Sequence, residues 1–183
     1  YTYKEVDDII AKGKMGKPVY TLYQISKKIA SKNVPSLVHP TGDWDSHKMV
    51  ETMMVVANMC VADFLHEHAY EIYISRSHTG LNNKIRDVPA DIIDKVRVLN
   101  TSAARYTVTH GSHRGLGVER YTHYTSPIRR IVDLYTHYLL KHVVFGHPIP
   151  DCIKQLPREL DYVNERVKQS KRFTLANNRL IIY

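Results

Sequence analysis

The residues from 46 to 67 constrain the fold most, because they predict a long helix that is apolar on almost every side. Asp45 or Ser46 is a suitable N-cap. The apolar positions are Met49, Met53, Val56, Cys60 and Phe64 on one face and Val50, Met54, Val55, Val61 and Leu65 on the others. A helix without a broad polar face belongs in a core, and we read Asn58 as a core amide that satisfies backbone groups. The longest mostly apolar run, residues 55–62, is far shorter than the roughly 20 residues of a membrane span, so we expect no membrane partner.

Further helices and a few strands are predicted around this central helix. Thr2 and Glu5 have the spacing of a capping box that opens a helix ending at Gly13. The remaining predicted helices cover residues 20–30, with Leu22, Ile25 and Ile29 as the apolar stripe, 91–104, 127–144 and 158 onward. Alternation predicts a strand over 70–76 and extended segments within 106–124, broken near Gly111 and Gly115, and loops are expected over 13–18, 33–43 and 146–157. These patterns predict a helix-rich α+β fold.

Basic residues are distributed unevenly along the chain. Its 26 Lys and Arg against 18 Asp and Glu give a formal net charge of +8. Residues 9–42 contain six lysines and no acid, and residues 105–130 contain five arginines against Glu119, interleaved with tyrosines and histidines. Cations mixed with aromatic rings suit single-stranded nucleic acid, whose phosphates pair with cations and whose bases stack on rings. A solvated basic surface without a ligand is the alternative.

Length, chain ends and cysteines set the expected context. The 183 residues fit one domain, or most of one. Because the chain starts at Tyr1 and ends on the apolar residues 180–183, we read it as a piece of a longer protein. Cys60 and Cys152 make no disulfide framework, so we expect reduced thiols in an intracellular, cytoplasmic protein, with a nuclear location as the alternative.

Ser126 and Pro127 predict the start of a helix, because serine is favoured at the N-cap and proline at the first helical position. The first turn would then carry Arg129 and Arg130, where the partial positive charge of the helix end prefers acids. Guanidinium groups beside outward-pointing backbone donors form an anion site, and their forked geometry matches phosphate. An exposed pair, or a salt bridge from either arginine to Asp133, is the alternative.

Arg130, Asp133 and His137 are predicted to share one helix face, since their spacing is i, i+3 and i+7. In the functional interpretation, Asp133 orients Arg130 and His137 continues the network. The alternative is a structural polar stripe, which we favour for His137.

Two windows of the sequence carry a recognisable pattern. One runs from Gly115-Leu116-Gly117 through Tyr121 to Arg130, followed by Asp133 and His137, and the other runs from Asp45 through Glu51 to Ala57-Asn58 and Ala62. Both resemble signatures of the RNB exoribonucleases, the family of ribonuclease II, ribonuclease R and the exosome nuclease, and they occur in that family's order. The resemblance implies a partial RNB domain over residues 1–183, the second half of that domain, with strands of a mixed sheet on a buried central helix.

The resemblance also implies roles for single residues. The position of Arg129 holds the scissile phosphate, and Arg130 supports it. Glu51 matches a carboxylate that contacts the sugars of the 3′-terminal nucleotides; a buried ion pair of Glu51 with Arg76 or an arginine of residues 105–130 is the alternative. The predicted RNA contacts are Glu51, Tyr121, His123, Tyr124, Thr125 and Ser126, and the predicted supporting residues are Asn58, Arg76, Asp133 and His137.

Members of the family degrade single-stranded RNA from its 3′ end to nucleoside 5′-monophosphates, with Mg²⁺ held by a cluster of aspartates. Nothing in this chain matches that cluster, so we expect the Mg²⁺ ligands upstream of Tyr1 and none here. The expected partners are single-stranded RNA, the rest of the RNB domain and its accessory S1 and cold-shock domains. Further departures are Tyr138, where the family usually has Arg, and a short segment between His78 and Ala103. A non-catalytic RNA-binding protein on a degenerate RNB fold is the alternative function.

Overall fold

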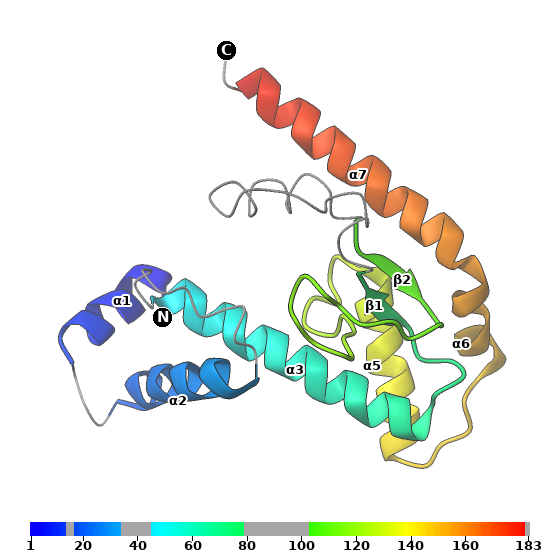
Figure 1. Ribbon diagram of the computed structural model, residues 1–183, viewed down its shortest axis with the longest axis horizontal. Coiled ribbons are helices and arrows are strands. Elements are labelled where there is room, and N and C mark those ends of the chain that lie inside the picture. Colours follow the sequence, from blue (N-terminus) through cyan, green and yellow to red (C-terminus); the bar gives the residue numbers. More distant parts are fainter. Residues whose placement is uncertain (14–16, 34–44, 79–102, 182–183) are drawn as a thin grey trace, which may run out of the picture.

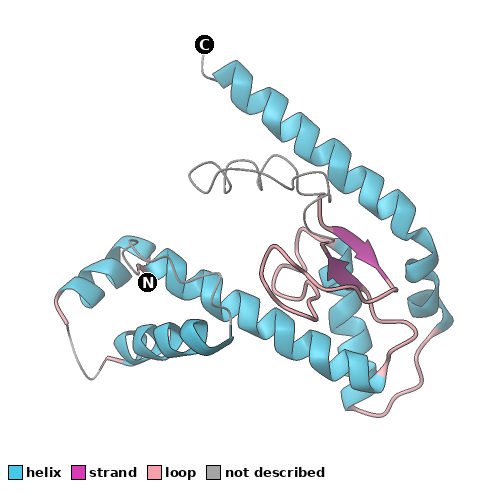
Figure 2. Cartoon of the chain, in the orientation of Figure 1, coloured by secondary structure: helices cyan, strands magenta, loops and turns pink. Residues whose placement is uncertain are grey.

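Helices make up most of the described chain and accompany one two-stranded sheet, so the predicted helix-rich α+β class is confirmed (Figure 1 and Figure 2). The computed structural model describes residues 1–13, 17–33, 45–78 and 103–181. The predicted helix over 91–104 and the predicted loop over 33–43 lie largely outside these ranges. The elements are α1 (Tyr3–Ala11), α2 (Pro18–Asn33), α3 (Ser46–His68), β1 (Ser75–Ser77), β2 (Arg105–Thr107), α5 (Ile131–Val144), α6 (Asp151–Gln155), the 3₁₀ turn η2 (Leu156–Glu159) and α7 (Leu160–Ile181).

Helix α3 connects the two ends of the described fold, as predicted for a central helix. It runs from α1 and α2 at its beginning to the sheet and α5 at its end (Figure 1). Asp45 is the N-cap and accepts a hydrogen bond from the Lys48 N–H. The buried residues are Ser46, Met49, Thr52, Val55, Asn58, Ala62 and Leu65. The predicted burial on all sides is wrong, because Val50 is 44% exposed and Cys60 is exposed.

Helix α3 also meets the length and composition criteria for a membrane-spanning helix. By length and apolar content alone the helix could cross a membrane, a criterion that core helices of soluble proteins meet as well. Its buried face includes the polar side chains of Thr52 and Asn58 and packs against α1, α2 and α5. We therefore treat it as a core helix.

Helices α1 and α2 pack on the first turns of α3. The predicted capping box is confirmed, since the Thr2 and Glu5 side chains each bond the other's backbone N–H. The Asp7 carboxylate accepts from the Ser46 N–H at 2.8 Å and joins α1 to the start of α3. The predicted stripe on α2 is wrong: Leu22 and Ile25 are 38% and 43% exposed. The helix instead buries Tyr23, Ser26 and Ala30. The small side chains of Ser26 and Ala30 allow close packing, and the Ser26 hydroxyl donates to the Tyr23 carbonyl.

The sheet is short and antiparallel, with Ser75 opposite Thr107 and Ser77 opposite Arg105. The predicted strand over 70–76 begins later, because the N–H groups of Ile72 and Tyr73 bond the Ala69 carbonyl and form a turn there. On the free side of β1, the Arg76 N–H donates to the Tyr121 carbonyl at 2.7 Å, so the segment around Tyr121 runs beside β1. The main core lies between the end of α3, the sheet, α5 and the start of α7, and is built by Leu65, Tyr73, Ile74, Tyr106, Val132, Tyr135, Leu139, Leu160 and Val163.

Helix α5 begins at Ile131, and the predicted start at Ser126-Pro127 is wrong. Arg130 is the N-cap residue, with an extended backbone at φ −132° and ψ 118°. The Ser126 side chain does not cap the helix; its backbone N–H donates to the Asp133 carboxylate at 2.8 Å. The end at Val144 and the apolar face of the last helix are as predicted, with Leu160 and Val163 buried. The short helix α6 falls within the predicted loop over 146–157.

Candidate functional site: a cationic cavity

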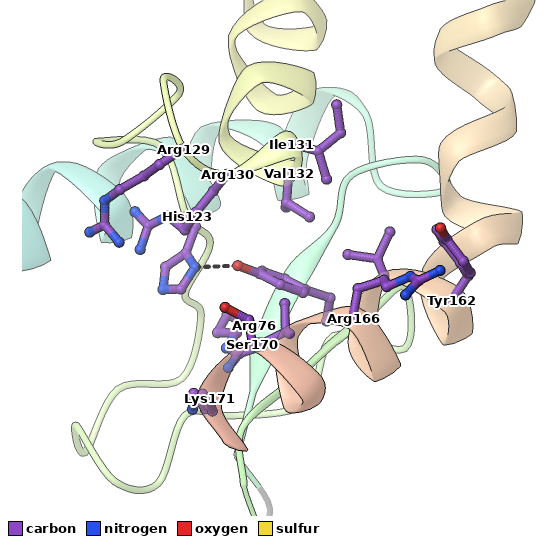
Figure 3. Close-up of a pocket in the computed structure, with 13 residues that line it drawn as sticks. Arg76, His123, Arg129, Arg130, Ile131, Val132, Tyr162, Arg166, Ser170 and Lys171 are labelled. Carbon is purple, nitrogen blue, oxygen red and sulfur yellow. Dashed lines mark hydrogen bonds between the residues drawn. The ribbon is translucent and has the colours of Figure 1, made fainter. Parts of the chain in front are cut away.

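A cavity of about 540 Å³ opens between the segment that precedes α5, the sheet and α7 (Figure 3). Its cationic lining comes from Arg76 of β1, Arg129 and Arg130 ahead of α5, and Arg166 and Lys171 of α7. Tyr106, His123, Tyr162 and Ser170 add aromatic and polar groups. No carboxylate lies among the described residues that line it, so the cavity is suited to an anion.

Arg129 and Arg130 reach this cavity from a turn rather than from the first turn of a helix. The Arg129 N–H bonds the Ser126 carbonyl at 3.3 Å, and α5 starts only after Arg130. The predicted placement of both arginines within the first helical turn is therefore wrong, although the first residues of α5, Ile131 and Val132, line the cavity as well. The predicted gathering of the two guanidinium groups is retained, because the turn directs both side chains to the same cavity (Figure 3).

The two arginines are held differently. The Arg130 guanidinium bonds the carboxylate of the fully buried Asp133 at 2.6 Å, which confirms the predicted pairing. Asp133 also accepts from the Ser126 N–H, so one carboxylate fixes both the arginine and the turn. Arg129 is exposed and forms no ion pair with any described residue. It is the arginine that is free to bind a ligand.

Arg76 is the buried cation of the cavity. It is 6% exposed, and its guanidinium carbon lies 4.3 Å from the ring centre of Tyr106. Burial is the main cause that lowers its pKa, and the neighbouring charge of Arg130 adds to the effect. Its Nη1 is buried without a hydrogen-bond partner.

His123 lines the same cavity beside Tyr106, with 2.7 Å between its Nδ1 and the tyrosine hydroxyl. Burial, followed by the charges of Arg130 and Arg76, lowers the pKa of His123 to about 3. The imidazole is therefore neutral near pH 7 and adds no further positive charge. It can accept or donate a hydrogen bond at the cavity wall.

Tyr121 and Asn58 build the support behind the cavity. Tyr121 is 4% exposed and accepts a hydrogen bond on its hydroxyl from the Asn58 amide at 2.9 Å. The Asn58 carbonyl oxygen accepts from the Tyr124 N–H at 2.9 Å. Asn58 is thus the predicted core amide. Tyr121 packs in the core in this structure, and its predicted RNA contact stays a prediction.

Tyr124 and His137 form a stacked pair away from the cationic lining. Their ring centres are 4.0 Å apart, and His137 Nε2 lies 2.8 Å from the Tyr124 carbonyl. Both rings line a separate groove of about 400 Å³ with Tyr138 and Phe145. His137 therefore holds the backbone of Tyr124 and does not extend the Arg130–Asp133 pair. The Thr125 hydroxyl next to Tyr124 is buried without a partner.

Glu51 lies outside the cationic cavity. Its carboxylate pairs with Lys48 at 2.7 Å and is 43% exposed. The predicted alternative, a buried ion pair with Arg76 or an arginine of residues 105–130, is not formed. The predicted sugar contact of Glu51 stays a prediction.

Sequence reasoning missed the contribution of α7. Three residues of α7 line the cavity from one face of the helix (Figure 3): Arg166, Ser170 four residues later, and Lys171 directly after it. The available signal was the run of basic residues in the last helix. Its direction toward Arg129 depends on tertiary packing and cannot be read from the local sequence.

The described residues do not fit a magnesium centre. No group of three or more His, Cys, Asp or Glu that could hold a metal ion occurs among them. Asp133, the carboxylate closest in sequence to the cavity arginines, is already bonded to Arg130 and the Ser126 N–H. Five cations around the cavity also disfavour a further cation there.

A buried arginine, an exposed arginine and a positive cavity are features that suit a phosphate-bearing ligand such as a nucleic acid. The RNB domain family model matches residues 81–146. Over 134 residues the chain is 30% identical to ribonuclease R of Helicobacter pylori. The aligned region is 55% of this chain and 21% of the relative. Over 136 residues it is 30% identical to exoribonuclease 2 of Yersinia pseudotuberculosis, again with 55% and 21% covered. The chain thus spans about a fifth of the length of these relatives.

Solved structures share the fold. Mycoplasma genitalium RNase R, in complex with ribose-methylated single-stranded RNA, matches with a TM-score of 0.73 and 20% identity over 99% of this chain and 39% of that chain. Yeast Ssd1, described as a pseudonuclease, matches with a TM-score of 0.71 and 17% identity over 90% of this chain and 28% of that chain. The resemblance of this chain to RNB-family exoribonucleases is confirmed.

Proposed function

We propose that this chain is part of an exoribonuclease that hydrolyses single-stranded RNA from its 3′ end to nucleoside 5′-monophosphates. Its contribution is to bind and orient the RNA backbone. The observation that carries the proposal is the exposed Arg129, unpaired among the described residues, in a positive cavity without lining carboxylates. The similarity to ribonuclease R and exoribonuclease 2 supports it.

In this proposal the cavity residues have separate tasks. Arg129 donates to the oxygens of the scissile phosphate and stabilises the charge that grows on them. Arg130, fixed by Asp133, keeps the turn and the positive field in place. Mg²⁺, when bound, would activate water and neutralise phosphate charge, and no group of described residues could hold it.

A second function is a non-catalytic RNA-binding protein on the same fold. The likeness to the pseudonuclease Ssd1 favours it. It keeps the cationic cavity and gives up hydrolysis. The two functions therefore differ in turnover and not in RNA binding.

The decisive experiment is Arg129→Ala in the full-length protein, followed by release of labelled nucleoside monophosphates from uniformly labelled single-stranded RNA with Mg²⁺. We expect turnover to fall by about a hundredfold to a thousandfold, because a donor to the transition state is lost, while RNA binding falls much less. Arg114→Ala is the matched control, since Arg114 is exposed and does not line the cavity. Absence of Mg²⁺-dependent release by the unchanged protein would favour the binding function.

We also propose a cytoplasmic location, supported by the free thiols of Cys60 and Cys152. The proposed partners are single-stranded RNA and the remainder of an RNB domain with its accessory RNA-binding domains.

A further inference from the structure

Arg76 has a charge that no described residue neutralises. It is 6% exposed, forms no ion pair with a described carboxylate, and leaves Nη1 without a hydrogen bond. The Tyr106 ring lies against the guanidinium, with its centre 4.3 Å from the guanidinium carbon. Burying a guanidinium without an anion is costly. Such a group is retained where a ligand supplies the missing negative charge.

The charges around Arg76 exceed what a single phosphodiester can neutralise. Five cationic side chains line the cavity, and among the described residues only Arg130 of these five has a carboxylate partner, Asp133. Four positive charges remain, whereas each phosphodiester of RNA carries one negative charge. A cavity of about 540 Å³ has room for more than one phosphate group.

The unpaired cations belong to two separate parts of the chain. Arg129 comes from the turn ahead of α5, whereas Arg166 and Lys171 come from α7, and Arg76 of β1 lines the cavity together with both (Figure 3). The Arg166 guanidinium is positioned by the Tyr162 ring, at 5.0 Å, and by a 3.0 Å bond to Gln169. A second phosphate position on the α7 side is therefore available beside the one at Arg129.

We propose that Arg76, together with Arg166 and Lys171, binds the phosphodiester adjacent to the one held by Arg129, so that the cavity grips two successive phosphates of the RNA. This inference rests on the proposed function, because it takes Arg129 as the first phosphate ligand. The stack on Tyr106 fixes the Arg76 fork in advance, so little side-chain freedom is lost on binding.

The first test is Arg76→Met, which keeps the long side chain and removes the charge. Affinity for a short fluorescein-labelled single-stranded RNA, measured by anisotropy with EDTA present to stop hydrolysis, should fall by about tenfold or more. The melting temperature should stay the same or rise, because an uncompensated buried charge has gone. A lower melting temperature with unchanged affinity would mean that Arg76 is structural and would overturn the proposal.

The second test does not touch a buried group. The double variant Arg166→Ala/Lys171→Ala removes the α7 cations, so the slope of log affinity against log salt should become shallower by about 0.7, the value for one phosphate contact of a single strand. Lys168→Ala is the matched control, since Lys168 lies on the same helix, pairs with Glu165 and does not line the cavity. An unchanged slope in the double variant would overturn the proposal.

Arg129→Ala in the same assays separates this inference from the function on which it rests. If Arg129→Ala abolishes hydrolysis while Arg76→Met and the α7 double variant bind RNA normally, the second phosphate position is wrong and the proposed function stands. If none of the variants changes binding or hydrolysis, both are wrong.

Discussion

The cavity arginines and the lysines of α2 are two basic regions of similar charge that are built in different ways. Lys28 and Lys32 of α2 are exposed and form no ion pair with described residues. In the cavity, Arg130 is fixed by a buried carboxylate at 2.6 Å and Arg76 by an aromatic ring at 4.3 Å. Prior positioning lowers the entropy cost of binding. Positive charge therefore predicts an anion partner, whereas the fixed position of that charge locates the site.

The cavity, where Arg130 and Arg76 are fixed in place, should lose most stability and RNA affinity when Asp133 is removed. Asp133→Ala leaves Arg130 without its carboxylate and the Ser126 N–H without its acceptor. We expect a loss of about 3 kcal/mol in the free energy of unfolding, because a partly buried cation loses its partner, and a marked fall in RNA affinity. Urea unfolding and RNA anisotropy measure the two effects. The control is Asp161→Ala, whose exposed ion pair with Arg105 should contribute nothing measurable.

The second prediction concerns pH and also separates the fixed region from the surface lysines. The pKa of His123 is lowered from 6.5 to about 3 in the folded chain, by burial first and then by Arg130 and Arg76. Burial and His78 lower the pKa of His113 from 6.5 to about 4. Between pH 6.5 and 4 the unfolded chain therefore binds more protons than the folded chain, and stability should fall as the pH falls.

His123→Gln removes one of these two contributions. The free energy of unfolding of the variant should depend less steeply on pH between about 6.5 and 4, and adding His113→Gln should flatten it further. Chemical unfolding at several pH values measures the slope. Equal slopes for the unchanged protein and the double variant would show that the two histidines titrate alike in both states.

Features set by neighbouring residues in the chain were predictable, and features set by distant residues were not. The capping box at Thr2 and Glu5 and the cap at Asp45 depend on three-residue spacings; the box was predicted, and Asp45 was one of the two predicted caps, with Ser46 as the other. The start of α5 was missed because the Asp133 carboxylate reaches back seven residues to the Ser126 N–H and holds the turn outside the helix. Local preference at Ser126 was overridden by a tertiary hydrogen bond.

The candidate site shows the same division. The sequence motif indicated Arg129 and Arg130 as an anion site, although it placed both arginines inside the helix, which starts only after them. The partners on α7, Arg166 and Lys171, were missed because only folding brings residues so far along the chain to Arg129. The unpaired state of Arg76 was equally invisible, since it depends on which carboxylates fail to reach a buried position.

The smallest effect on RNA affinity is expected for the exposed lysines of α2. Lys28→Ala/Lys32→Ala removes two exposed charges, and RNA affinity should change by less than about twofold. Exposed ammonium groups are strongly hydrated and screened by salt, so they contribute little binding free energy. Anisotropy with the same RNA, at two salt concentrations, measures it. The salt slope should also stay unchanged. A slope shallower by about 0.7 or more would mean that RNA phosphates contact α2 as well. In that case the two basic regions would form one continuous RNA-binding surface, and fixed arginines would no longer be what distinguishes the site.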